Sequence, residues 1–141
     1  HVVTEALEAV IEANILMSGL GFENVGCAAA HAVSNGLSAC PGGNKALHGE
    51  KVAFGVICQL VAENTGKALM DEIMKFYLEV GLPLTLEDMG LEPCDVNYDI
   101  ISADISQTDW VREPFCVNES IVRAAIAAAQ EAGRLFKSMQ T

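Results

Sequence analysis

The chain has 141 residues, a length that suits one domain with a single core. Hydrophobic residues make up 51% of the chain and aromatic residues only 6%, and the many alanines favour closely packed helices. The 19 acidic residues outnumber the 8 basic ones and give a formal net charge of -11, so repulsion from phosphate excludes a nucleic-acid-binding role.

Targeting and membrane signals are not visible in the sequence. It contains no run of about 18 apolar residues and therefore predicts no transmembrane span. The first residues lack the basic region and cleavage site of a signal peptide. Five cysteines, an odd number without Cys-x-x-Cys spacing, predict a reducing and cytoplasmic setting. The chain opens on His1 without a methionine, and we expect it to be a fragment of a longer protein.

The first two predicted helices are separated by glycines. Thr4 is a suitable N-cap for the first helix, whose apolar residues recur at helical spacing until Gly19 and Gly21 end it. The second helix begins at Asn24 or Gly26 and stops at Asn35-Gly36. Its run of alanines implies close contact between helices, so we expect this segment to be buried on most sides.

The remaining segments are also predicted to be helical. After a loop marked by Pro41-Gly42-Gly43 comes a helix that is apolar almost all round and therefore central. The predicted elements from there on are a helix over Leu47 to Asn64, an amphipathic helix over Ala68 to Val80, a short turn over Leu86 to Met89, a helix over Asn97 to Gln107, an irregular stretch over Asp109 to Val117, and a last helix over Glu119 to Ser138 capped by Asn118. With no convincing strand pattern, the sequence predicts an all-α, bundle-like domain of about six helices.

Several other features are interpreted as structural. The acidic pair Glu87-Asp88 is expected on the solvated surface, and Trp110 is expected to anchor an irregular stretch against the bundle. Three methionines serve as core or interface filler: Met70, Met74 and Met89.

Two histidines carry the main chemical signal. His31 and His48 lie 17 positions apart in small apolar segments joined by the glycine-rich loop, which allows the two rings to face each other. The neutral imidazole is a natural ligand for zinc or ferrous iron. The alternative for a lone histidine among alanines is a hydrogen-bonded core side chain. Two ligands bind weakly, so a third must come from elsewhere. Glu50 and Lys51 receive no catalytic role, because a glutamate in a first helical turn complements the helix dipole.

The sequence around these histidines is specific. The segments GFENVGCAAAHAVSNGL, LHGEKVAFG, VGLPLTLEDMGL and FCVNESIVRAAIAAAQEAG resemble the C-terminal, metal-binding helical part of glycerol dehydrogenases, in the iron-containing alcohol dehydrogenase superfamily. The resemblance covers nearly the whole chain, residues 1–141, and implies the α-domain of the dehydroquinate synthase type. It implies NAD-dependent oxidation of a polyol, glycerol to dihydroxyacetone, in a cytoplasmic enzyme that is a homo-oligomer at full length.

The same resemblance assigns site residues. It implies that His31 and His48 hold zinc or iron, and that Phe22 forms an apolar wall beside the substrate; a core anchor at a helix end is the alternative for Phe22. The third ligand of the family, an aspartate on an earlier helix, and the N-terminal NAD-binding domain have no counterpart in this sequence. The metal site is therefore expected to be incomplete and the piece alone inactive. Val25 replaces a usual glycine and Ser34 a common second histidine, changes that could alter the polar relay beside the site.

Two rival interpretations stay open. The chain could be a catalytically silent helical module for assembly or protein interaction, marked by an exposed apolar face and no metal. Alternatively, a partner chain could supply the nucleotide-binding domain, in which case activity would appear only on mixing.

Overall fold

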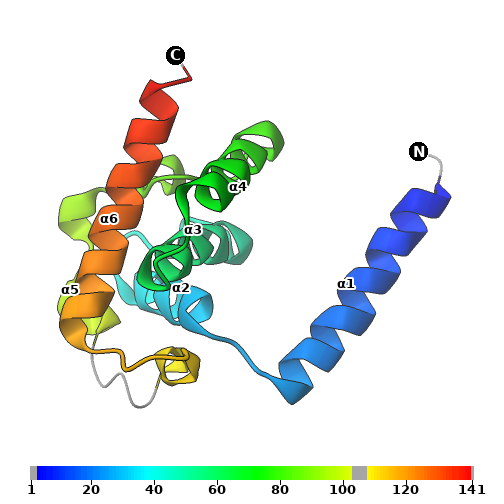
Figure 1. Cartoon of the computed structure of the whole chain (residues 1–141), viewed down its shortest axis with the longest axis horizontal. Coiled ribbons are helices and arrows are strands. Elements are labelled where there is room, and N and C mark those ends of the chain that lie inside the picture. Colours follow the sequence, from blue (N-terminus) through cyan, green and yellow to red (C-terminus); the bar gives the residue numbers. More distant parts are fainter. Residues whose placement is uncertain (1–2, 103–107, 141) are drawn as a thin grey trace.

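The structure is a computed structural model that describes residues 3–102 and 108–140. Every regular element within those ranges is a helix, which confirms the predicted all-α class (Figure 1). The α-helices are α1 (Glu5–Asn24), α2 (Ala29–Ala39), α3 (His48–Ala62), α4 (Lys67–Val80), α5 (Tyr98–Ile101) and α6 (Glu119–Ser138). Short 3-10 helices occur at η1 (Glu87–Met89), η2 (Pro93–Asp95) and η4 (Asp109–Arg112).

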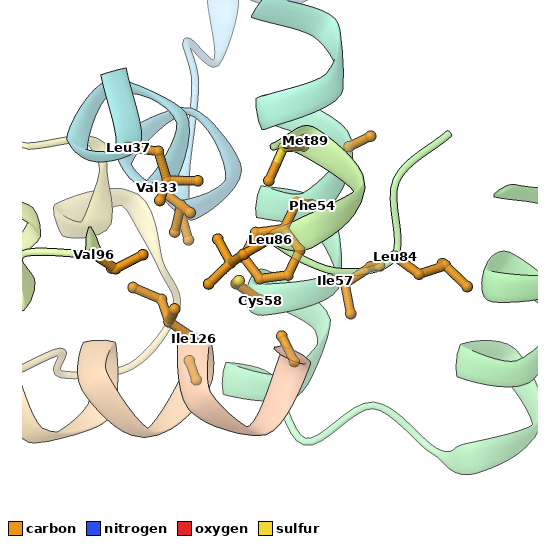
Figure 2. Close-up of a cluster of buried hydrophobic side chains, with 14 of the residues drawn as sticks. Val33, Leu37, Phe54, Ile57, Cys58, Leu84, Leu86, Met89, Val96 and Ile126 are labelled. Carbon is orange, nitrogen blue, oxygen red and sulfur yellow. The ribbon is translucent and has the colours of Figure 1, made fainter. Parts of the chain in front are cut away.

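The core is built on the helix pair α2 and α3. These helices run antiparallel, because Ser38 bonds to Lys51 at one end of the pair and Ala30 bonds to Gln59 at the other. α6 packs across α3, and α5 and η4 pack on α2. Figure 2 shows the buried side chains between them, drawn from α2, α3, α6 and the segment around Leu86. The predicted burial of the alanine-rich second helix is confirmed, since six of its residues are buried.

Close helix contact at the core depends on small residues. A Cβ added at Gly55 would lie 2.2 Å from the carbonyl oxygen of Ala30, and one added at Gly133 would lie 2.1 Å from that of Leu84. Real Cβ atoms essentially never come this close to an oxygen, so these glycines let backbones approach directly. They fix how α3 lies on α2 and how α6 lies on the segment before η1.

α1 lies apart from this core. Figure 1 shows it extending to one side of the bundle, joined to α2 by a short connection, and none of its residues is buried. Among the described helices, α1 included, none is long and apolar enough to cross a lipid bilayer. The Thr4 cap is confirmed, because its hydroxyl accepts a hydrogen bond from the Leu7 N–H at 3.2 Å. The predicted end at Gly19 and Gly21 is wrong, since α1 continues to Asn24.

The glycine positions explain these shifted helix ends. A glycine inside a helix costs about 1 kcal/mol relative to alanine but does not break it. α2 starts at Ala29 and not at Asn24 or Gly26, because Gly26 has a φ of +75° that no α-helical residue adopts. It also runs past Asn35-Gly36 to Ala39. There Gly36 serves packing, since a Cβ on it would lie 2.8 Å from Cγ1 of Ile101.

The later elements agree better with their predictions. α3, α4 and α6 lie within two residues of the predicted bounds, and Asn118 caps α6 by accepting from the Ile121 N–H at 3.0 Å. The buried stripe of α4 is Met70, Met74 and Tyr77, whereas the neighbouring Phe76 is 54% exposed. The helix predicted over Asn97 to Gln107 is the short α5, and residues 103–107 lie outside the described ranges.

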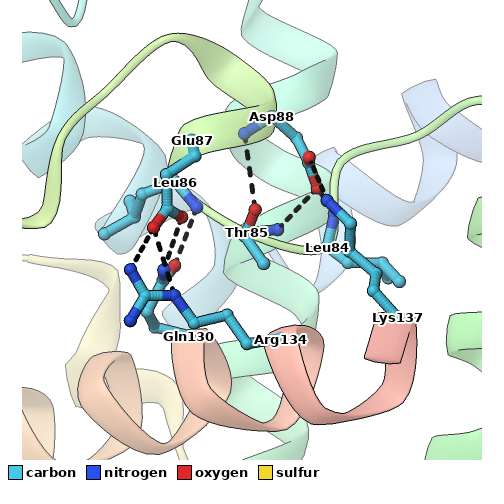
Figure 3. Close-up of polar contacts among 8 residues, drawn as sticks. All are labelled: Leu84, Thr85, Leu86, Glu87, Asp88, Gln130, Arg134 and Lys137. Atoms are coloured by element: carbon cyan, nitrogen blue, oxygen red, sulfur yellow. Dashed lines mark hydrogen bonds and ion pairs between the residues drawn. The ribbon is translucent and has the colours of Figure 1, made fainter. Parts of the chain in front are cut away.

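Glu87 and Asp88 lie at the surface as expected, since Asp88 is exposed and Glu87 partly exposed, but their carboxylates have protein partners that the sequence did not predict. Figure 3 shows both carboxylates engaged with α6: Glu87 binds Gln130 and Arg134, and Asp88 binds Lys137. Asp88 also accepts from the backbone N–H groups of residues 84 and 85 at 3.0 and 3.1 Å. Their partners on α6 are more than 40 residues away in sequence, and the two carboxylates bind the η1 segment to α6. Trp110 is fully buried, as predicted.

Candidate metal centre

The structure brings the two predicted histidines together. His31 lies in the first turn of α2, and His48 is the first residue of α3. Their ring centroids are 5.6 Å apart, and the ring planes are tilted by 53°. His31 is partly buried and His48 is exposed, so the pair lies at the edge of the helix pair, open to solvent. The prediction that the glycine-rich loop lets these rings face each other is confirmed.

Two glycines and a buried lysine determine where the loop between α2 and α3 turns. Gly42 has a φ of +81°, and a Cβ at Gly43 would lie 1.9 Å from the carbonyl oxygen of Leu37. Lys51, which is 6% exposed, closes the same corner by donating to Ser38 Oγ at 2.7 Å and to the Gly43 carbonyl at 3.0 Å. These contacts join the end of α2 to the start of α3, the turn that carries His48.

The two residues left without a catalytic role have structural ones. Glu50 Oε2 accepts from the Leu47 N–H at 2.7 Å, so it caps the start of α3. Lys51 is engaged in the loop contacts just described. Both side chains therefore make hydrogen bonds within the fold.

The spacing of the two histidine rings fits two coordination positions of one metal ion. Two imidazoles on one tetrahedral ion, with nitrogen–metal distances of about 2.0–2.1 Å, place their ring centroids about 5 Å apart. The observed 5.6 Å is close to that spacing, and imidazole nitrogens suit zinc or ferrous iron. Within residues 3–102 and 108–140, no three His, Cys, Asp or Glu side chains gather closely enough to hold an ion. The spacing of the pair is therefore compatible with two coordination positions of one ion, and the described residues form no larger ligand cluster.

Ser34 lies beside the pair. It is fully buried one turn after His31, and its Oγ is 3.4 Å from Nδ1 of His48, a long hydrogen bond. In the tautomer with the proton on Nδ1, His48 donates to Ser34 and leaves Nε2 for a ligand. The other departure from the family pattern, Val25, is 76% exposed with a φ of -115°, which requires no glycine.

The N-terminus of α2, next to His31, is held by side chains that sequence analysis missed. Glu113, 8% exposed, accepts from the Ala29 N–H through Oε1 at 3.0 Å, and Gln59 accepts from the Ala30 N–H at 3.2 Å. Burial raises the pKa of Glu113, and the nearby Glu63 adds to the rise, while the bond from Ala29 opposes it. No local signal identifies Glu113, because 84 positions separate it from Ala29.

Phe22 is far from being a core residue. It lies near the end of α1 and is 65% exposed, so the core-anchor alternative is wrong. Its assignment to a substrate wall stays a prediction. A hollow on α1, about 510 Å³ in volume, is lined by other residues: Glu12, Ile15, Leu16, Gly19, Leu20 and Glu23. A second cavity, of about 310 Å³, lies between α2, α5 and η4, and neither histidine lines it.

Comparison with known proteins supports the resemblance found in the motifs. No protein-family model matches the chain. It is 46% identical to a glycolaldehyde reductase of Halobacterium salinarum over 135 residues, which cover 94% of this chain and 37% of that protein. It is 42% identical to a glycerol dehydrogenase of Thermotoga maritima over 142 residues, which cover 97% of this chain and 38% of that protein. The chain thus spans less than two fifths of the length of these relatives.

Solved structures give the same result. A probable glycerol dehydrogenase from Sinorhizobium meliloti superimposes with a TM-score of 0.85 at 39% identity, over 94% of this chain and 38% of that one. The glycerol dehydrogenase of Schizosaccharomyces pombe superimposes with a TM-score of 0.87 at 34% identity, over 99% of this chain and 37% of that one. The second match spans nearly every residue, so it includes the isolated helix α1 as well as the helix pair that carries the histidines.

Proposed function

We propose that this chain, which belongs to the glycerol dehydrogenase family over the part of those enzymes that it spans, supplies two metal ligands to a polyol dehydrogenase. The observation that supports this most directly is the pairing of His31 and His48, with ring centroids 5.6 Å apart at a solvent-accessible edge. The relatives named glycerol dehydrogenase indicate the substrate class, and we propose glycerol, oxidised to dihydroxyacetone, as the substrate.

The residues of the chain have defined tasks in this proposal. His31 and His48 hold the ion, and Ser34 Oγ orients the His48 ring through its contact with Nδ1. When bound, zinc or ferrous iron supplies Lewis-acid chemistry, which lowers the pKa of an alcohol and favours loss of hydride to a nicotinamide. Phe22 borders the substrate on its apolar side. The remaining ligand and the site for NAD come from polypeptide beyond this sequence, so the chain by itself is inactive.

The cysteines bear on the cellular compartment of the protein. The five cysteines are free thiols in the structure, two of them buried, and we place the protein in the reducing cytoplasm. The full-length enzyme is proposed to be a homo-oligomer.

A zinc titration tests the metal site. In the chain with isotope-labelled histidines, Zn²⁺ should shift the ring signals of His31 and His48 together. His31→Ala and His48→Ala should each abolish the shift of the remaining partner, because one imidazole holds zinc far more weakly than two. If Zn²⁺ leaves both wild-type rings unmoved, the metal-site proposal is wrong.

A second candidate, a helical assembly module, is favoured by α1 alone. This helix buries no residue and exposes large apolar side chains such as Ile15 and Met17, which are 72% and 70% exposed. Such surfaces on a soluble protein mark interaction sites. Unmoved histidine signals combined with concentration-dependent association in sedimentation experiments would support this candidate over the enzyme. Dehydrogenase activity that appears only on mixing with a nucleotide-binding chain would instead support the metal site with NAD supplied in trans.

A further inference from the structure

The first turn of α2 has an unusual way of satisfying its backbone N–H groups. The first four N–H groups of any helix lack partners within the helix, and a Ser, Thr, Asp or Asn at the N-cap commonly satisfies one of them. Here the N-cap is Ala28, whose side chain accepts nothing. The N–H groups of His31 and Ala32 turn back to the Ala28 carbonyl at 3.0 and 3.3 Å. The N–H groups of Ala29 and Ala30 therefore need acceptors from elsewhere in the fold.

Two distant side chains provide those acceptors. Glu113, from the end of η4, accepts from Ala29 at 3.0 Å in a buried setting, and Gln59 of α3 accepts from Ala30 at 3.2 Å. On the other side of the same turn, the Ala30 carbonyl lies directly against Gly55 of α3. The turn that precedes His31 is thus held at three points, two of which belong to α3.

These contacts make the position of His31 relative to His48 depend on how the first turn of α2 is held. His31 directly follows Ala30 in sequence, and His48 begins the helix that contributes Gln59 and Gly55. A rotation or shift of the first turn of α2 would move the His31 ring relative to His48. The spacing of 5.6 Å between the rings therefore depends on what holds Ala29 and Ala30 in place.

We propose that Glu113 and Gln59 are positioning residues of the histidine pair: their side-chain oxygens hold the N–H groups of Ala29 and Ala30 and thereby set His31 opposite His48. The inference rests on the proposed function for its consequence in metal binding. Its geometric content, the distance between the rings, is independent of any metal. Glu113 acts as a hydrogen-bond acceptor in this role, so a glutamine in its place should serve as well.

The test compares four variants by NMR of the histidine rings, with and without Zn²⁺. Glu113→Ala and Gln59→Ala remove an acceptor and should weaken Zn²⁺ binding by about 10-fold, the low end of the effect of residues that support metal ligands. Glu113→Gln keeps an acceptor oxygen and should stay within about 2-fold of the wild type. Gln130→Ala is the matched control, because Gln130 likewise accepts from a buried backbone N–H, that of Leu86 at 2.8 Å, on another part of the fold.

The control separates positioning from stability. Gln130→Ala should lower the melting temperature as Glu113→Ala does, yet leave Zn²⁺ affinity unchanged. If Glu113→Ala binds Zn²⁺ like the wild type, or if Glu113→Gln loses as much affinity as Glu113→Ala, the inference is overturned. Should Glu113→Ala fail to fold, Gln59→Ala carries the same comparison.

A metal-free measurement distinguishes this inference from the proposed function. The nuclear Overhauser contact between the His31 and His48 rings should be present in the wild type and Glu113→Gln and reduced in Glu113→Ala. If the wild-type rings do not respond to Zn²⁺ but this pattern holds, the metal site is wrong and the positioning role stands. An unchanged ring contact in Glu113→Ala and Gln59→Ala removes the positioning role, whatever the metal does.

Discussion

α1 and α6 are both 20 residues long, and each begins with a side-chain cap, Thr4 in one and Asn118 in the other. Their surroundings differ completely. α6 buries seven residues along one stripe, while α1 buries none. The charges differ in the same sense: the charged residues of α1 are all acidic, whereas α6 holds its neighbours through Arg123, Arg134 and Lys137.

The difference lies in the pattern of apolar residues. α6 has a clear apolar stripe with polar residues opposite, which is typical of a helix lying on one core. α1 is apolar around most of its circumference, which is typical of a helix surrounded by other elements. In the structure those elements are not found among residues 3–102 and 108–140. α1 thus gains no stability from burial against the described part of the chain, whereas the partners of α6 are present there.

The largest effect expected from this contrast comes from one isoleucine on each helix. Ile126 is fully buried on α6, so Ile126→Ala should lower the free energy of unfolding by about 2–5 kcal/mol. Ile15 is 72% exposed on α1, and Ile15→Ala should change it by less than about 0.5 kcal/mol. Urea unfolding followed by circular dichroism measures both. Equal losses would show that α1 packs on something in the isolated chain.

Replacing one glycine on each helix by alanine should change the stability in opposite directions. Gly133→Ala on α6 would force a Cβ against the Leu84 carbonyl, and we expect a loss of about 1–3 kcal/mol in unfolding free energy. A Cβ added at Gly19 on α1 would have no neighbour within 4 Å. Because alanine has the better helix propensity, Gly19→Ala should stabilise α1 by up to about 1 kcal/mol and raise its helix content. The helical signal in circular dichroism reports the second effect. A destabilising Gly19→Ala would mean that α1 has a close neighbour.

The third prediction concerns the carboxylates that bind α6 to the η1 segment. Partial burial alone would raise the pKa of Glu87, but hydrogen bonds from Arg134 and Gln130 outweigh it and bring the pKa to about 2. Burial opposes the shift at Asp88 too, yet its hydrogen bonds, chiefly the one from Lys137, lower its pKa. A carboxylate held more acidic in the folded state stabilises the fold above its unfolded pKa, and this contribution disappears as pH falls.

Acidification should therefore weaken the attachment of α6. Between about pH 4.5 and pH 2, unfolding free energy should fall faster in the wild type than in Glu87→Gln. At neutral pH Glu87→Gln should cost about 1 kcal/mol, since the partners are partly exposed. The urea midpoint measured across this pH range checks both statements. Parallel pH profiles for the two proteins would show that Glu87 does not contribute.

Local signals account for what the sequence predicted well. The start of α6 follows from Asn118 and a regular apolar stripe, both contained in neighbouring residues. The meeting of His31 and His48 follows from a short loop whose glycines restrict its path. In each case the information lies within a few turns of the residue concerned.

Long-range contacts account for the errors. The ion pairs of Glu87 and Asp88 were not predicted, because Arg134 and Lys137 are 47 and 49 positions away. Gly36 resembles a helix end because its actual task, contact with Ile101, cannot be seen locally. A single sequence does not reveal which distant side chain meets which backbone group.

The smallest effect expected concerns Ser34, which connects the core of α2 to the exposed His48. Ser34→Ala removes a long hydrogen bond to Nδ1 of His48, so the unfolding free energy should change by less than about 1 kcal/mol. The consequence at the ring should be clearer. Without Ser34 Oγ, Nδ1 of His48 loses its hydrogen-bond partner, and the ratio of the two neutral tautomers should move toward that of a free imidazole. Nitrogen-15 shifts of the His48 ring measure the tautomer ratio. An unchanged ratio would mean that the 3.4 Å contact does not orient the ring, and the exposed histidine would then be held by its helix alone.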